Sequence, residues 1–315
     1  MDVLSLYSTK LSRLHRATIK NVKAPHQPIL LLSVIQSIAC GEITDNRVEI
    51  TPELVARFKD NWSLLVNDNF LQPQFALPFY HLKNNRGKFW HLQTIPGKEI
   101  LLTSSFSIKS FTQLKEAVAY AYLDEPLFAL LAVPETREIL YSLLLEQYFP
   151  NRQLTNIQMS LFEKYAGQIL HDTSAVYRKE IETADEEEIF IRCGVFKKVI
   201  PQIYDNACSI SGMRIISGYN IQMIDACHIV PFAVSHDDTI SNGISLSPNL
   251  HRAFDRGLLA IDDDYKVMIS SGFTEEISPN SLRAFEGKRI QLPEKVDYRP
   301  LIENIRWHRK EIFKA

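Results

Sequence analysis

The chain has 315 residues, which is enough for two domains of ordinary size, each with its own buried core. With 45% hydrophobic and 23% charged residues, its composition is that of a soluble globular protein. The formal net charge of −2 excludes a protein that coats nucleic acid through overall basic charge, so any basic surface must be local. The longest apolar run, residues 29–34, is far shorter than the ~20 residues that span a bilayer. With no signal-peptide pattern at the start, we expect a cytoplasmic protein without a membrane partner.

Residues 1–150 are predicted to form a mainly helical DNA-reading domain with one β-hairpin. A buried helix is expected at 29–39, ended by Gly41, and Thr51 caps another helix that opens on Pro52. Around Pro78 the apolar spacing changes, which predicts a hairpin with strands at 78–82 and 88–92. Further helices are predicted at 110–121, 125–132 and 134–149.

Residues 151–192 are predicted to be a helical connector, and residues 193–315 a second domain. That domain should hold a short helix at 196–205, a strand at 220–230, a helix at 248–256, a hairpin at 258–270 and an amphipathic helix at 298–313. Core packing is the favoured role for the last helix, and the face of a homodimer is the alternative. The four cysteines form no C-x-x-C pair, which argues against a disulfide framework and a four-cysteine zinc site. The expected fold class is α+β.

Three short motifs in the second domain supply the groups that phosphodiester hydrolysis requires. Asp225-Ala-Cys-His-Ile-Val-Pro231 places a histidine on an apolar strand, and Asn242-Gly243 forms a turn. His251 and Asp255 are four residues apart and would share one helix face. A neutral histidine can act as general base, and a divalent ion can neutralise charge. Each motif alone is common in proteins, but their order and spacing together favour a nuclease.

This order resembles the HNH endonucleases, whose ββα-metal fold surrounds one ion with two strands and a helix. The resemblance covers residues 196–265 and is closest to the branch found in bacterial restriction enzymes. It is carried by Cys227-His-Ile-Val-Pro231, Asn242-Gly243, Leu246-Ser-Pro248 and His251-Arg-Ala-Phe-Asp-Arg-Gly-Leu258.

The resemblance implies a role for each signature residue. His228 would be the general base, Asn242 would orient that base or hold the loop, and His251 would be the third signature residue. His251 and Asp255 would bind the metal. The third ligand is open: Asp225 is favoured and suits Mg²⁺ or Mn²⁺, whereas a Cys227 ligand would favour Zn²⁺.

Two further expectations concern the surroundings of these residues. On a flat strand Asp225 would face away from His228, so a bulge would be needed to bring them together. Arg252 and Arg256 flank the metal face, where each would either contact a DNA phosphate or pair with the acidic residues 262–264.

The first domain resembles a sulfur-binding domain, the module that recognises phosphorothioate-modified DNA ahead of an HNH domain in modification-dependent restriction endonucleases. The resemblance is carried by residues 23–32, 46–52, 77–82 and 89–92. Sulfur is larger, softer and less hydrated than oxygen, so an apolar pocket beside cationic or amide donors can prefer it. The residues expected to form this pocket and its DNA contacts are His26, Gln27, Pro78, Tyr80, His81, Arg86 and Lys88.

Two features depart from the sulfur-binding pattern. Leu77 precedes the pocket proline where an aromatic residue is common, and residues 103–106 supply no arginine after the hairpin.

Together the two resemblances predict a type IV-like restriction endonuclease that binds phosphorothioate-modified double-stranded DNA and cuts it with one divalent metal ion. One alternative is an HNH enzyme directed by modified cytosine or by plain sequence. Another, from a different class, is a non-catalytic DNA-binding module with a relic HNH fold. The intact signature residues argue against a relic.

Overall fold

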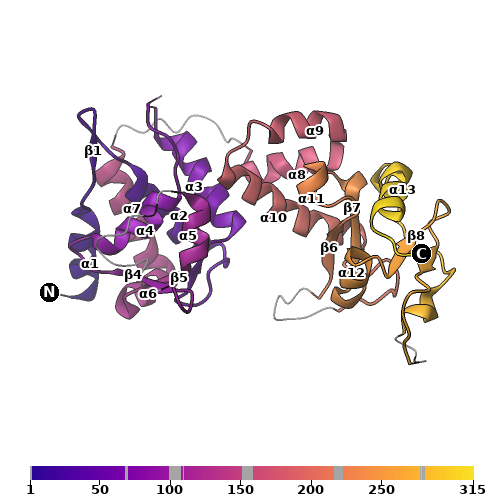
Figure 1. Cartoon of the computed structure of the whole chain (residues 1–315). Coiled ribbons are helices and arrows are strands. Elements are labelled where there is room, and N and C mark those ends of the chain that lie inside the picture. The colour runs from indigo at the N-terminus through magenta and orange to yellow at the C-terminus, as the bar shows by residue number, and fades with distance from the viewer. Residues whose placement is uncertain are drawn as a thin grey trace. The chain divides into compact units, whose positions relative to one another are not determined.

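The computed structural model describes residues 2–67, 70–98, 108, 110–150, 159–215, 223–276, 278 and 281–315. The chain divides into two compact units (Figure 1). Unit 1 comprises Met1–Leu161 and Glu186–Ile191, and unit 2 comprises Phe162–Asp185 and Arg192–Ala315. Helices and small antiparallel sheets occur together, which confirms the α+β class. Among the described helices, none combines the length and apolar character needed to cross a membrane.

Unit 1 combines helices with a three-stranded sheet and a two-stranded hairpin. Its helices are α1 Val3–Ser12, α2 His26–Ala39, α3 Pro52–Leu65, α4 Ala76–His81, the 3₁₀ helix η1 Leu82–Asn84, α5 Phe111–Ala117, α6 Glu125–Ala132 and α7 Pro134–Tyr148. Its strands are β1 Thr18–Ile19, β2 Val22–Lys23, β3 Val48–Glu49, β4 Trp90–Thr94 and β5 Val118–Leu123. β1 pairs with β2, and β5 is the central strand between β3 and β4.

Several predicted helix boundaries are confirmed. The Thr51 side chain accepts a hydrogen bond from the backbone N–H of Leu54, and Pro52 occupies the first turn of α3. Helix α2 ends at Ala39, and Gly41 follows in the left-handed conformation, with φ of +72°.

The predicted hairpin around Pro78 is wrong in its first half. Residues 76–81 form helix α4, and Phe75, Phe79 and Leu82, in this helix and at its two ends, recur at helical spacing and are fully buried. Pro78 lies in the first helical turn, where its missing N–H breaks no helical hydrogen bond.

The second half of the predicted hairpin, β4, pairs with β5 instead. Residues 118–121 were expected to be helical but belong to β5. Val118 and Ala121 are buried, and the segment pairs with β4 and β3, so tertiary pairing overrides local helix propensity.

Unit 2 contains a ββα substructure followed by a second hairpin. Its helices are α8 Leu161–His171, α9 Ser174–Ile181, α10 Glu186–Ile203, α11 Phe232–Ser235, the 3₁₀ helices η3 Ile240–Asn242, η4 Leu282–Phe285 and η5 Val296–Tyr298, α12 Pro248–Asp255 and α13 Ile302–Glu311. Its strands are β6 Asp225–His228, β7 Gly243–Leu246, β8 Leu259–Ile261 and β9 Val267–Ile269. The first residue of α8 and residues 186–191 of α10 belong to unit 1.

The predicted elements of the second domain are largely present. Helix 248–256 and hairpin 258–270 correspond to α12 and to β8 and β9, which confirms both predictions. The predicted strand 220–230 is shorter, since only 225–228 form β6, and residues 220–222 lie outside the described residues. The final helix begins at Ile302 rather than 298. The predicted helix 196–205 is the end of the longer α10.

Gly257, directly after α12, fixes how the end of the chain packs on this helix. Its φ is +70°, and a Cβ atom there would fall well inside the contact distance of the Ile312 carbonyl oxygen. The backbone N–H of Lys314 donates a hydrogen bond to the Gly257 carbonyl at 3.0 Å. A side chain at this position would therefore push two backbones apart.

We expect Gly257→Ala to destabilise unit 2 far more than Gly287→Ala. Both glycines have positive φ, but a Cβ at Gly287 meets nothing within 4 Å. Gly287→Ala should cost about 1 kcal/mol of backbone strain, whereas overpacking adds about 1–3 kcal/mol at Gly257. Urea unfolding of the two variants measures the difference, and equal losses would contradict the packing argument.

Candidate nuclease site and reader pocket

The short strand β6 distributes the chemical groups between its two faces. It pairs with β7 residue for residue, from Asp225 opposite Leu246 to His228 opposite Gly243, without a bulge. Side chains therefore alternate, with Asp225 and Cys227 on one face and His228 on the other. The bulge that would bring Asp225 to the side of His228 is absent from this ladder.

On the first face, the two β6 side chains meet His251 and Asp255 of α12. His251 Nδ1 lies 3.1 Å from Asp225 Oδ2, and its Nε2 lies 3.4 Å from Asp255 Oδ2. The Cys227 thiol lies 3.8 Å from Asp255 Oδ1. One ligand atom from each of Cys227, His251 and Asp255 falls within 4.8 Å of the others.

These residues fit a divalent cation in their chemistry. Imidazole, carboxylate and thiolate are all common ligands of transition metals. Burial, followed by the nearby charge of Asp255, raises the pKa of the Cys227 thiol, so binding through its sulfur would release a proton. Asp225 contacts the imidazole nitrogen opposite to the one that faces Asp255.

On the second face, His228 contacts a residue that the sequence analysis did not single out. Its Nε2 lies 2.7 Å from Oδ1 of Asp238, whose carboxylate is fully buried. The imidazole also stacks on Phe196 of α10, with ring centroids 4.0 Å apart and planes 6° from parallel. The histidine predicted on an apolar strand therefore has one edge of its ring against a carboxylate.

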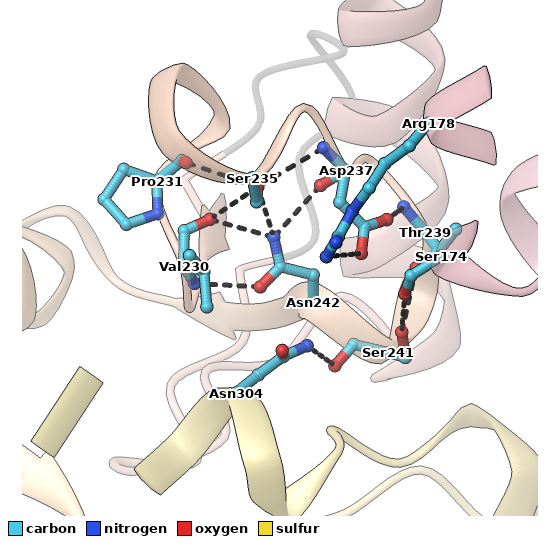
Figure 2. A network of polar contacts seen from close by, with 10 residues as sticks. All are labelled: Ser174, Arg178, Val230, Pro231, Ser235, Asp237, Thr239, Ser241, Asn242 and Asn304. Carbon is cyan, nitrogen blue, oxygen red and sulfur yellow. Dashed lines mark hydrogen bonds and ion pairs between the residues drawn. The ribbon is translucent and has the colours of Figure 1, made fainter. Parts of the chain in front are cut away.

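Asn242 clamps the two ends of the segment that joins β6 to β7 (Figure 2). Its side-chain carbonyl accepts from the backbone N–H of Val230 at 2.8 Å. Its amide donates to the carbonyl oxygens of Val230 and Asp237, at 2.9 and 3.0 Å. The side chain is fully buried, and its contacts are with the loop rather than with His228. Of the two roles considered for Asn242, these contacts favour holding the loop.

Helix α9 supports the same loop from a part of the chain far upstream. Figure 2 shows Arg178 beside Asp237, at 3.9 Å, and Ser174 beside Ser241, at 3.4 Å. Tyr177 of the same helix donates to Asp238 at 3.2 Å. These residues were predicted to belong to a connector. No local signal in the sequence relates them to the loop, since the contacts join residues 59 to 67 positions apart.

Arg252 and Arg256 of α12 and the turn after it are exposed. Among the described residues, neither guanidinium forms an ion pair or hydrogen bond. Asp263, one of the acidic residues that might have paired with them, instead forms ion pairs with Arg306 and Arg309, both at 2.8 Å. Of the two predicted roles, pairing with the acidic residues is therefore not seen among the described residues. The contacts favour the other role, in which both guanidinium groups are available to DNA phosphates.

Unit 1 contains a pocket of about 410 Å³ that brings together several predicted reader residues. Its apolar lining consists of Ala17, Ile19, Ala24, Leu77 and Pro78. Its polar lining consists of His15, Arg16, His26, Gln27, His81, Asn84 and Asn85. Pro78, His26, Gln27 and His81 are thus gathered at one pocket, although by a helix at 76–81 rather than by a hairpin.

Other predicted reader residues lie elsewhere. Tyr80 is 1% exposed and packs in the core, so its expected contact with DNA is contradicted by its burial. It follows Phe79 on α4, and both rings face inward. Arg86 and Lys88 are exposed but do not line the pocket. The arginine-free segment 103–106 lies outside the described residues.

The pocket is lined by the guanidinium of Arg16 and by two imidazoles, those of His26 and His81, whose pKa values are lowered. Arg16, which the sequence analysis missed, has its guanidinium 4.7 Å from the centre of the Tyr148 ring. Burial lowers the pKa of His26, and burial followed by the charge of Lys83 lowers the pKa of His81. At neutral pH both imidazoles are therefore uncharged, and Arg16 supplies the positive charge of the lining.

Comparison with known proteins agrees with the geometry of unit 2. The HNH endonuclease family model matches residues 208–262, which include β6, β7 and α12. A search of curated proteins found no match.

Two of the matching solved structures are restriction enzymes. The modification-dependent TagI restriction endonuclease is 25% identical with a TM-score of 0.28, and the match covers 37% of each chain, so this protein spans little more than a third of that structure. The type IV phosphorothioation-dependent restriction endonuclease ScoMcrA is 10% identical with a TM-score of 0.34, over 78% of this chain and 94% of the other.

The family match and the ββα geometry identify residues 208–262 as an HNH endonuclease domain. Such a domain is a DNA endonuclease module, a metal-dependent hydrolase of phosphodiester bonds. The part of unit 2 that matches the family model is therefore similar to an HNH endonuclease domain.

We expect Arg252→Ala and Arg256→Ala each to weaken DNA binding by unit 2. Loss of one phosphate contact should lower the slope of log K against log salt by about 1. The matched control is Arg306→Ala, because Arg306 is already paired with Asp263. Fluorescence anisotropy at several salt concentrations gives the slopes, and an equal loss in the control would contradict a specific role for the two arginines.

Proposed function

We propose that the protein is a modification-dependent restriction endonuclease, in which unit 1 reads phosphorothioate-modified duplex DNA and the HNH domain cuts it. The observation that carries the nuclease assignment is the arrangement around β6. A group of side chains that could bind a metal ion occupies one face of this strand, and a histidine paired with a carboxylate occupies the other. Both sets lie within or beside the segment that matches the HNH family.

The exposed parts of the site are those that a phosphate must reach. The side chains of His228 and His251 are 23% and 26% exposed, whereas Cys227 and Asp238 are buried. His228 would accept a proton from water. The water oxygen then bonds to phosphorus while the bond from phosphorus to the 3′ oxygen breaks. Arg252 and Arg256 would hold neighbouring phosphates in register.

The metal would be held by His251, Asp255 and Cys227. Asp225 was expected to be the third ligand, but it contacts Nδ1 of His251, whereas Nε2 faces Asp255. We therefore assign Asp225 the orientation of His251, as carboxylates commonly do for metal-bound histidines. When bound, the ion neutralises phosphate charge and assists departure of the 3′ oxygen. A thiolate ligand shifts the expected preference from Mg²⁺ toward softer ions such as Zn²⁺.

The pocket in unit 1 supports a preference for sulfur over oxygen. Its lining combines apolar side chains such as Leu77 and Pro78 with the cation of Arg16. A phosphorothioate keeps the negative charge of phosphate but presents one poorly hydrated atom, whose desolvation costs less free energy. Uncharged His81 can donate a hydrogen bond without attracting ordinary phosphate strongly, whereas the Nε2–H of His26 is already donated to the Gln72 carbonyl at 2.9 Å.

We expect His228→Ala to abolish cleavage while leaving DNA affinity and metal affinity unchanged. The substrates are phosphorothioated, cytosine-methylated and unmodified duplexes of one sequence, each tested with Mg²⁺, Mn²⁺ and Zn²⁺. Cleavage restricted to the phosphorothioated duplex supports the proposed function. Cutting of all three, or of the methylated duplex alone, would assign a different cue, and cleavage that survives in His228→Ala would overturn the site.

Leu77→Asn should reduce the preference for phosphorothioate, because a polar pocket wall removes the advantage of a poorly hydrated atom. The ratio of dissociation constants for phosphate and phosphorothioate duplexes should fall by about 10-fold, as expected for ~1.4 kcal/mol. Leu6→Asn is the control, since Leu6 lies exposed on α1 away from the pocket. An unchanged ratio in Leu77→Asn would argue against this pocket as the sulfur site.

A further inference from the structure

The imidazole of His228, which is partly exposed, contacts the carboxylate of Asp238, which is buried. The imidazole Nε2 and the carboxylate Oδ1 are 2.7 Å apart. Asp238 is 0% exposed, whereas the His228 side chain is 23% exposed. Ten residues separate the two along the chain, so the contact depends on the path of the loop between β6 and η3.

A buried carboxylate is costly unless donors surround it. The second oxygen of Asp238 accepts a hydrogen bond from the Tyr177 hydroxyl at 3.2 Å, and the Cys193 thiol lies 3.9 Å away. Burial raises the pKa of Tyr177, so its hydroxyl stays protonated and remains a donor. The carboxylate is thus held on one side by α9, and its remaining oxygen is directed at His228.

The stacked ring of Phe196 fixes the plane of the imidazole. A carboxylate accepts but cannot donate, so a neutral His228 must carry its proton on Nε2 to make this contact. Nδ1 then has a lone pair, and among the described residues it has no hydrogen-bond partner. This is the protonation pattern that a general base requires at the atom that receives the proton.

We propose that Asp238 is a positioning residue for DNA hydrolysis: its buried carboxylate, anchored by Tyr177 of α9, holds His228 in the tautomer whose Nδ1 can accept a proton. This inference rests on the proposed nuclease function. It also brings residues into the site from a helix that lies upstream of the family match.

Asp237 provides a matched control for Asp238. It is equally buried, at 1% exposure, and comes directly before it in the loop. Its carboxylate accepts from the backbone N–H of Thr239 at 2.9 Å and pairs with Arg178, but it does not contact His228. Loss of this carboxylate should disturb the loop without changing the imidazole tautomer.

The test compares Asp238→Asn, Asp237→Asn and Tyr177→Phe with the wild-type full chain. An asparagine amide can donate to Nε2, which would favour the tautomer with its proton on Nδ1. We expect Asp238→Asn to lower the single-turnover cleavage rate at saturating DNA by about 10²–10⁴-fold, with unchanged DNA affinity. Asp237→Asn and Tyr177→Phe should each lower the rate by less than about 10-fold.

A second readout does not depend on cleavage. Nitrogen-15 NMR of labelled histidine, recorded where the ring is neutral and assigned with His228→Gln, reports which nitrogen carries the proton. The proton should be on Nε2 in the wild type and in Asp237→Asn, but on Nδ1 in Asp238→Asn. A wild-type proton on Nδ1, or a cleavage rate in Asp238→Asn equal to that of the wild type, would overturn the inference. A wild type that shows the expected tautomer but cuts no DNA would contradict the proposed function alone.

Discussion

The alternation of side chains along β6 is the constraint on which the arrangement of the site depends. In a strand of four residues without a bulge, neighbouring side chains must point to opposite faces. Asp225 and Cys227 therefore meet the helix α12, while His228 meets the loop that follows the strand. A single strand thus separates the candidate metal ligands from the proposed general base, and each face has its own set of supporting residues.

The residues that support the loop on the His228 face are polar and buried. Burial of polar groups costs free energy unless each has a hydrogen-bond partner. Asn242 satisfies backbone groups of Val230 and Asp237 that would otherwise lie without partners inside the protein. Removing one such partner leaves desolvated groups, at a cost of about 1–3 kcal/mol each. The clamp and the Asp238 contact belong to one loop, so the position of His228 depends on a network rather than on one hydrogen bond.

The sequence was most informative where function demands particular residues at fixed spacing. His251 and Asp255 share a helix face, as the i, i+4 spacing predicts, and Thr51 and Gly41 mark helix ends through their own local chemistry. Asp238 could not be recognised in the same way. It stands in a polar loop beside another aspartate, and its role appears only when the fold brings His228 and Tyr177 to it.

Errors in the first domain have a related cause. The segment around Pro78 has both the alternation of a strand and the i, i+4 spacing of a helix, and burial of Phe75 and Phe79 decides between them. Arg16 lies in the pocket because the short β1–β2 hairpin returns the chain to α2. Two-residue strands give almost no periodic signal, so the cation of the pocket was not predictable from its neighbours.

The backbone crosses between the two units more than once, which limits how the protein can be divided into fragments. The backbone passes from unit 1 to unit 2 at residue 162, returns for residues 186–191 and leaves again at 192. A fragment that starts at 193 would keep every signature residue of the HNH motif but lose Tyr177 and Arg178. A fragment that starts at 162 would keep them, together with six residues whose packing partners lie in the other unit. Replacement of unit 1 by another domain would therefore have to preserve residues 186–191 as well as the junction at residues 161–162, rather than a single linker.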